Sequence, residues 1–129
     1  EIQRVLNDDG TLIYYDIFRK NSKDVNYPVP WANDKSTSFL DTIENMDEIL
    51  INLGFSSNHT DDQTARANKF LLGLFDKIKL NGPPKLGLNV LIGDSTKEKL
   101  TNILKGIEEN RIILHSGIYK RQKNGKVFN

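Results

Sequence analysis

Three carboxylates recur at helical spacing in the first half of the chain. Asp41, Glu44 and Glu48 are three and four residues apart, so they share one face of a predicted helix. Carboxylates at such spacings can share a divalent cation. The same face offers no histidine and no further carboxylate to complete a site. We therefore expect a solvated acidic face, and a docking surface for a basic partner is the second interpretation.

Other residues that could bind a metal or act as a nucleophile are sparse. The chain has no cysteine, which excludes disulfides, thiolate zinc sites and a cysteine nucleophile. His59 lies in a polar stretch and His115 lies among apolar neighbours, and their spacing does not indicate a metal site. Residues 82–87 lack the Gly-Lys-Ser/Thr ending of a phosphate-binding loop. The sequence therefore predicts no metal and no cofactor.

A four-residue block in the second half, Ile-Gly-Asp-Ser at residues 92–95, resembles the Gly-Asp-Ser nucleophile block of the SGNH-type hydrolases. That family needs a later Asp-x-x-His to supply the base. No aspartate precedes His115 by three residues, and too little chain follows Ser95 to build that fold. We therefore interpret Asp94 or Ser95 as a helix cap and reject the hydrolase interpretation.

Basic residues collect near the C-terminal end. Residues 110–129 contain no acidic residue and five basic ones: Arg111, Lys120, Arg121, Lys123 and Lys126. Together with the helix predicted before it, this basic hairpin tip resembles the wing of a winged-helix DNA-binding domain. The resemblance implies phosphate contacts, and Tyr119 could stack on a single strand. The alternative is a solvated terminus whose lysines keep a strand edge from aggregating.

An aromatic and proline-rich segment follows the first predicted strand. In Tyr27-Pro28-Val29-Pro30-Trp31, two prolines favour an extended backbone between the aromatic rings. Aromatic residues on a stiff segment lose little entropy on docking, so Tyr27 and Trp31 are candidates for binding a protein partner. The alternative is a strap that both rings pin to the domain.

Turn signals and hydrophobic periodicity predict the elements that position these residues. Residues 7–10 between Val5-Leu6 and residues 11–18 predict an N-terminal β-hairpin. Capping patterns and glycine stops predict three helices, which begin near Ser38, Thr60 and Ser95. The second helix has a stripe expected to be buried: Phe70, Leu71, Leu74, Phe75 and Ile78.

Two shorter segments complete the predicted fold. Residues 88–92 are a short apolar run that suits a strand or a turn of helix. Asn124-Gly125 predicts a C-terminal β-hairpin between residues 111–120 and 126–128. We predict an α+β fold with an N-terminal β-hairpin, a three-helix core with one short strand, and a C-terminal β-hairpin.

Length and composition suit one globular domain. The chain has 129 residues, 37% of them hydrophobic and 27% charged, and its net charge of +1 indicates no particular partner. Because it begins at Glu1, we expect residues 1–129 to be a single domain of a longer chain. No apolar run is long enough to span a membrane, and no signal peptide is visible. We therefore expect a soluble, intracellular protein of the cytoplasm or nucleus, with no membrane partner.

The function predicted from these residues is a non-catalytic protein-interaction module of a larger protein or assembly. It follows because no nucleophile–base pair and no metal set can be named, and for the same reason we do not predict an enzyme. The partner-binding candidates are Tyr27, Trp31, Asp41, Glu44 and Glu48. The alternative is a nucleic-acid-binding domain that uses Arg111, Tyr119, Lys120, Arg121, Lys123 and Lys126. A small enzyme with a diffuse carboxylate or lysine site is the third and weakest interpretation.

Overall fold

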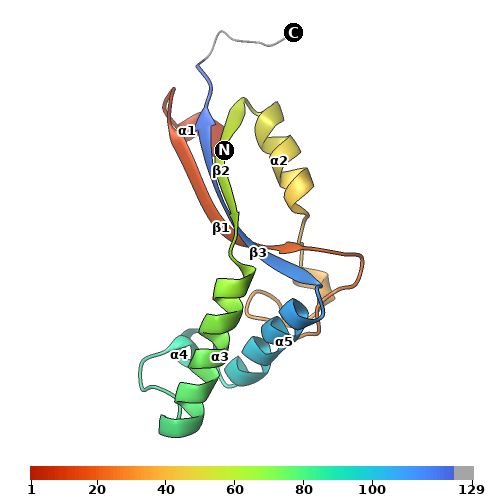
Figure 1. Ribbon diagram of the computed structural model, residues 1–129, viewed down its shortest axis with the longest axis vertical. Helices are drawn as coiled ribbons and strands as arrows, with labels where there is room; N and C mark the ends of the chain where they lie inside the picture. The colour runs from red at the N-terminus through yellow and green to blue at the C-terminus, as the bar shows by residue number, and fades with distance from the viewer. Residues whose placement is uncertain (124–129) are drawn as a thin grey trace.

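A three-stranded antiparallel sheet in the order β1-β3-β2 organises the structure (Figure 1). The computed structural model describes residues 1–123. Strands β1 (Thr11–Arg19) and β2 (Phe55–Asp62) pair with opposite edges of the central β3 (Ile112–Arg121). The helical elements are α1 (Ile2–Val5), the 3-10 turn η1 (Lys35–Thr37), α2 (Ile43–Asn52), α3 (Thr64–Asn81), α4 (Leu88–Ile92) and α5 (Thr96–Glu108). The predicted α+β class is confirmed.

The predicted N-terminal β-hairpin is not formed. Residues 2–5 are helical, and β1 pairs with β3 in a continuous register from Thr11↔Lys120 to Arg19↔Ile112. The long, regular pairing with β3 is available to all nine residues of β1, whereas Val5-Leu6 offers only a two-residue arm. At the other end, residues 124–128 of the predicted C-terminal hairpin lie outside the described residues.

Strand β2 was not predicted. Its sequence is polar apart from Phe55, and its pairing with β3 is interrupted by a bulge between Ser57 and His59. Thr60, expected to cap a helix, lies in this strand, and α3 begins at Thr64. The carboxylate of Asp62 accepts a hydrogen bond of 2.9 Å from the backbone N–H of Thr64. Hydrogen bonds from Thr64 also lower the pKa of Asp62.

The structure moves the start of one predicted helix and decides between the two alternatives for residues 88–92. Helix α2 begins at Ile43 instead of near Ser38, because the Thr42 hydroxyl accepts the backbone N–H of Asn45 at 3.2 Å and caps it. Residues 88–92, for which strand and helix were both open, form helix α4. No helix within residues 1–123 combines the length and the apolar character needed to cross a membrane.

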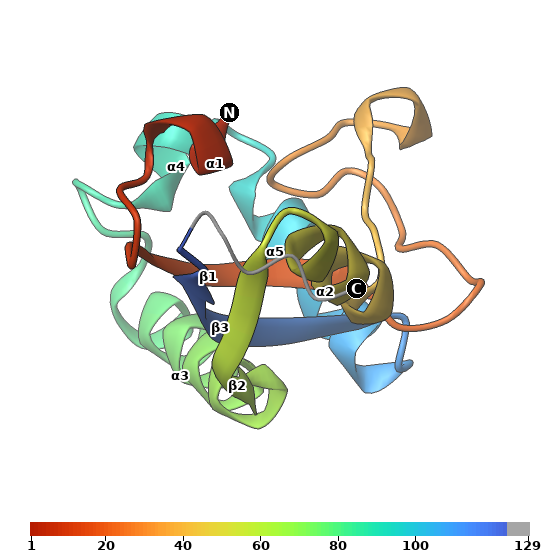
Figure 2. The same cartoon turned by 90° about the horizontal axis from the view of Figure 1, so that it is seen from above.

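The two faces of the sheet carry separate hydrophobic clusters. On one face α3 and α5 bury a cluster that includes Leu71, Ile103 and Ile112, and on the other α2 covers a cluster of Leu50, Phe55 and Tyr119. Figure 1 shows α2 beside the upper part of the sheet, with α3, α4 and α5 gathered at its lower end. Seen from above, α3 and the loop between β1 and α2 extend from opposite sides of the sheet (Figure 2).

The buried face of α3 is narrower than the predicted stripe. Leu71 is buried, and Leu74 and Phe75 are partly buried against the same cluster. Phe70 is 68% exposed, so its prediction as a core residue was wrong. The helix turns Phe70 away from the layer formed by α5 and β3, where Ala67 and Leu71 pack instead.

Candidate functional site

The carboxyl end of β1 opens onto a small polar cavity of about 130 Å³. Its lining residues come from the end of β1, from the loop that follows, and from η1 and the residues just after it. They are Arg19, Ser22, Asp24, Lys35, Ser38 and Leu40. A concave site with a few converging polar groups is the usual form of a small-ligand site.

The loop between β1 and α2 is fixed by hydrogen bonds of its backbone and of Asp24, which also lines the cavity. The backbone N–H of Arg19 donates to the carbonyl of Asp41 at 2.8 Å, which ties the end of the loop to the end of β1. The carboxylate of Asp24 accepts hydrogen bonds from the Tyr27 hydroxyl at 2.9 Å and from the backbone N–H of Val25 at 2.8 Å.

Arg19 and Lys35 supply the positive charge of this cavity. Neither side chain forms an ion pair with any other residue in the range 1–123. Both side chains belong to exposed residues, and the Arg19 charge helps to lower the pKa of Asp41, after the Thr42 and Asn45 hydrogen bonds. Two unpaired cations at a small cavity suit an anionic group such as a phosphate or a carboxylate.

A row of aromatic and polar side chains lies on the sheet face beneath α2. The Tyr14 hydroxyl is 2.9 Å from Nδ1 of His115, and the Tyr119 hydroxyl donates to the Asp47 carboxylate at 2.5 Å. The Tyr14 ring stacks on both His115 and Tyr119, with centroids 6.0 Å apart. Burial raises the pKa of both tyrosines. Because each hydroxyl has a partner within the protein, this row holds α2 on the sheet.

The predicted partner-binding aromatics are pinned to the domain. Trp31 and Tyr27 pack against the cluster under α3 and α5, and Trp31 Nε1 donates to the Ser38 hydroxyl at 3.1 Å. Tyr27 is held by Asp24. Both aromatic residues thus contact residues that line the cavity, as in the strap interpretation. Their role in binding a protein partner stays a prediction.

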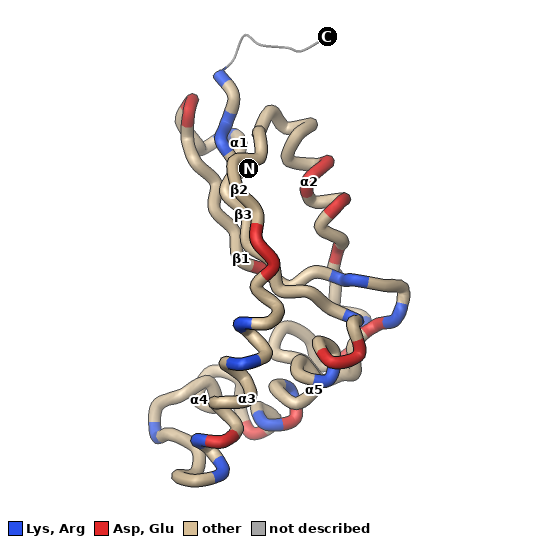
Figure 3. Tube along the Cα trace, in the orientation of Figure 1, with Lys and Arg blue, Asp and Glu red and all other residues tan. Residues whose placement is uncertain are grey.

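The predicted acidic set is divided by the start of α2. Glu44 and Glu48 lie on the exposed part of that helix, whose acidic residues are visible in Figure 3. Asp41 lies outside the helix, where its carboxylate accepts the backbone N–H of Thr42 and the side chain of Asn45. These two hydrogen bonds lower the pKa of Asp41. The three carboxylates therefore do not share one helix face, and a partner-binding role stays a prediction.

The residues predicted to contact nucleic acid do not form one surface. Tyr119 is 1% exposed, so its ring cannot stack on a base. Arg111 lies at the opposite end of β3 from Lys120, pairs with Glu109 at 2.5 Å and donates to the carbonyl of Asp24 at 2.7 Å. Lys126 lies outside the described residues.

The remaining basic residues are matched by the turn before β1. Lys123 pairs with Asp9 at 3.2 Å, Arg121 approaches Asp8 at 3.9 Å, and Lys120 donates to the carbonyl of Asp9 at 3.2 Å. These contacts offset much of the positive charge on which phosphate binding would depend.

The two cations of the cavity were not found from the sequence. Arg19 ends a β-rich run and Lys35 lies in an irregular loop, and only the folding of that loop brings them to one cavity. The sequence signal that could have indicated this site was a charged residue at the carboxyl end of a predicted strand.

Comparisons with known proteins find a similar fold in parts of solved methyltransferase structures. No family model matches the chain, and neither does any curated protein. Two structures of Haemonchus contortus phosphoethanolamine N-methyltransferase 2 are similar, each with a TM-score of 0.70 and 16% identity. One is a complex with phosphomonomethylethanolamine and S-adenosylhomocysteine, and the other a complex with S-adenosyl-L-methionine. A proposed sarcosine dimethylglycine methyltransferase from Galdieria sulphuraria has a TM-score of 0.53 and 11% identity.

The matches cover most of this chain but only part of those proteins. They span 95% of this chain, 28% of each Haemonchus chain and 45% of the Galdieria chain. At these identities the likeness shows the fold alone.

This likeness contradicts two predictions made from the sequence. The fold forms part of catalytic proteins, so the prediction of a non-catalytic interaction module and the prediction against an enzyme were both wrong. The same likeness overturns the winged-helix alternative, and the turn of the predicted wing lies outside the described residues.

Proposed function

We propose that this chain is the substrate-side portion of an S-adenosylmethionine-dependent N-methyltransferase whose substrate is a small amine with an anionic group. The observation that carries the proposal is the TM-score of 0.70 over 95% of the chain to phosphoethanolamine N-methyltransferase 2. The Galdieria protein supports the same class, because sarcosine and dimethylglycine are also small amines that bear an anionic group.

The cavity at the end of β1 supports an anionic substrate. Its volume of about 130 Å³ suits a single phosphate or carboxylate group and is too small for a nucleoside. An anion in this cavity would be attracted by Arg19 and Lys35, which outnumber the one carboxylate among the lining residues, that of Asp24. Ser22 and Ser38 add hydroxyl groups that can donate hydrogen bonds to the same anion.

The described residues do not fit the methyl donor by themselves. A nucleoside cofactor commonly uses a glycine-rich turn after a strand and a carboxylate that binds the ribose hydroxyls. Neither β1 nor β2 is followed by a glycine-rich turn. Two larger cavities along α3, of about 400 and 370 Å³, have only Arg66, Lys69 and Lys77 as charged lining residues. The proposal therefore assigns no donor site to the described residues.

Titration with phosphomonomethylethanolamine tests the substrate-side assignment. We expect the chain to bind this amine, and Arg19→Ala or Lys35→Ala to weaken binding by about tenfold each. A charge-assisted hydrogen bond to an anion contributes about 1.5–3 kcal/mol, and solvent exposure reduces that contribution. Isothermal titration calorimetry at low salt measures the affinities.

The matched control is Lys23→Ala, which removes an exposed lysine of the same loop that does not line the cavity. It should leave the affinity unchanged. An equal loss in the Lys23 variant would show nonspecific attraction by the loop, and no binding by the unaltered chain would contradict the proposed function.

A further inference from the structure

Large apolar side chains are exposed where the end of α3 leads into α4, a segment of residues 80–91 that we call the apolar tip. It lies at the lower end of the molecule in Figure 1. Its exposed aliphatic residues are Leu80 (83%), Leu86 (89%), Leu88 (46%), Val90 (61%) and Leu91 (85%). Exposed apolar surface that collects in one place marks a site of contact with another protein or with a membrane.

Local contacts hold the apolar tip in its conformation without covering these side chains. A Cβ atom on Gly87 would lie 2.6 Å from Cγ of Pro84, so the turn before α4 is tightly packed. The backbone N–H of Val90 donates to the carbonyl of Gly87 at 3.0 Å. Lys99, a buried residue of α5, donates from Nζ to the carbonyl of Ile92 at 3.3 Å and ties the end of α4 to α5. The exposure of the apolar side chains is therefore a feature of the folded segment.

Lysines border the apolar tip, and no ion pair neutralises them. Lys77 and Lys79 lie near the end of α3, and Lys85 lies between the exposed leucines. All three are exposed, and none forms an ion pair with another of the described residues. Between Asp76 and Asp94 the chain has no acidic residue. Figure 3 shows basic positions at this end of the molecule, with acidic ones beside them.

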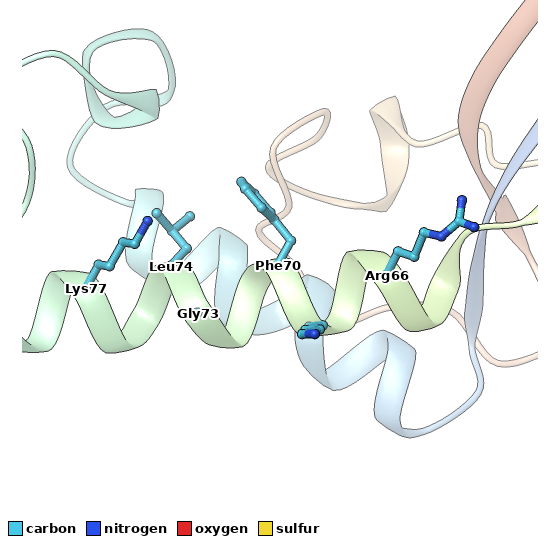
Figure 4. Close-up of a pocket in the computed structure, with 6 residues that line it drawn as sticks. Arg66, Phe70, Gly73, Leu74 and Lys77 are labelled. Atoms are coloured by element: carbon cyan, nitrogen blue, oxygen red, sulfur yellow. The ribbon is translucent and has the colours of Figure 1, made fainter.

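A groove on α3 adds apolar surface beside one of these lysines. Its volume is about 400 Å³, and Phe70, Leu74 and Lys77 are among its lining residues. Figure 4 shows these three side chains projecting from the same side of the helix. Aliphatic residues bordered by lysines suit the surface of an anionic bilayer. Apolar side chains enter the boundary between head groups and acyl chains, and the long lysine side chains keep their charges at the level of the phosphates.

We propose that the apolar tip binds the surface of a bilayer that contains anionic lipids. Leu86 and Leu91 enter the boundary below the head groups, and Lys79 and Lys85 are attracted by the lipid phosphates. The charge favours an anionic bilayer over a second copy of the chain, because two copies joined at their tips would bring like charges together. The contact lies on the bilayer surface and needs no spanning helix. It is independent of the proposed function.

Co-sedimentation with vesicles tests the lipid contact. The full chain is mixed at low salt with vesicles of phosphatidylcholine and phosphatidylserine, and in parallel with vesicles of phosphatidylcholine alone. We expect about tenfold stronger binding to the anionic vesicles and a decrease as salt is added. Leu86→Ser combined with Leu91→Ser should weaken binding by about tenfold or more, because the insertion of apolar side chains is lost. The matched control, Ile13→Ser combined with Tyr15→Ser, changes exposed apolar residues of the sheet and should bind as the unaltered chain does.

Charge reversal tests the electrostatic part of the contact. Lys79→Glu combined with Lys85→Glu should weaken binding to the anionic vesicles by about tenfold or more, because attraction is replaced by repulsion. Lys20→Glu combined with Lys23→Glu changes the net charge equally at exposed residues of the loop beside the anion cavity, and it should leave vesicle binding unchanged. An equal loss in this control would place the lipid contact at the anion cavity and overturn the proposal. Circular dichroism of each variant checks that the fold is retained.

A fluorescent label reports whether the apolar tip enters the bilayer. The chain has no cysteine, so Leu91→Cys provides a single site for a nitrobenzoxadiazole label, whose emission moves to the blue in an apolar environment. We expect this shift when anionic vesicles are added. The control is the same label on Ile13→Cys, which is also exposed and should show no shift.

Three further results would overturn the lipid proposal. The first is no binding of the unaltered chain to the anionic vesicles. The second is equal binding by the Leu86 and Leu91 double variant, which would show attraction by charge alone. The third is a dimer in solution that the same double variant abolishes, which would identify a second copy as the occupant. The proposed function fails separately, through absent phosphomonomethylethanolamine binding.

Discussion

Replacing Ile112 with alanine is expected to lower the free energy of unfolding by about 2–5 kcal/mol, the range for truncating a large aliphatic side chain in a core. Ile112 is 1% exposed and lies at the start of β3, where it joins the cluster under α3 and α5. Its Cδ1 and Cγ1 atoms come within 3.2 Å of the position that a Cβ atom on Gly106 would occupy. With α5 packed this closely, the structure cannot easily collapse into the space that alanine leaves.

The matched control is Ile13→Ala, the same substitution in the same sheet at a side chain that is 68% exposed. It should change the stability of the isolated chain by about 0.5 kcal/mol or less. Urea denaturation followed by circular dichroism measures both variants. If Ile112→Ala costs no more than Ile13→Ala, then β3 does not pack against α5 as described.

Local signals predicted the elements that depend on local contacts. Gly54 and Gly82 follow α2 and α3 with φ angles of 86° and 73°, and both were predicted as helix stops because glycine tolerates this conformation. Phe55, just after Gly54, joins Leu50 of α2 in one cluster. These features involve neighbouring residues, so the sequence pattern contains most of the information that determines them.

Features that depend on distant residues were not predicted. The turn at residues 7–10 indicated a hairpin, but β1 instead pairs with a strand about a hundred residues later. Strand β2 is polar because much of it lies at an exposed edge, so it lacks the alternation by which strands are recognised. Phe70 shows that a helical stripe identifies apolar residues but not which of them the neighbouring elements cover.

The function was misinterpreted for a related reason. The chain contains no complete catalytic set, and we took this as an argument against an enzyme. A chain that spans 28% of a similar enzyme need not contain every part of its active site. Arg19 and Lys35 line one cavity only in the folded structure, where the loop after β1 brings Lys35 to the end of that strand.

Replacing Tyr119 with phenylalanine is expected to lower the free energy of unfolding by about 1.5–3 kcal/mol at neutral pH, the contribution of a hydrogen bond to a charged group. Tyr119 is 1% exposed, and its hydroxyl donates to the Asp47 carboxylate at 2.5 Å. The variant keeps the ring in the cluster with Leu50 and Phe55 but removes the donor from a half-buried carboxylate on α2. The decrease in the free energy of unfolding therefore measures how much this hydrogen bond contributes to holding α2 on the sheet.

The same substitution should reduce the loss of stability in alkaline solution. Burial and then the Asp47 carboxylate raise the pKa of Tyr119 in the folded protein, whereas a tyrosine in the unfolded chain ionises near pH 10. The unfolded state therefore loses this proton first, so the stabilisation is complete below about pH 10 and declines as the pH rises above it.

Urea unfolding between pH 8 and pH 11 tests this second part of the prediction. The unaltered chain should lose stability steeply at the alkaline end, and Tyr119→Phe should lose less, with some slope remaining because burial also raises the pKa of Tyr14. Tyr15→Phe is the control, because this tyrosine is 59% exposed and should follow the unaltered profile. Parallel profiles for the unaltered chain and Tyr119→Phe would show that the Tyr119 hydroxyl is not buried against Asp47, and α2 would then need another anchor on the sheet.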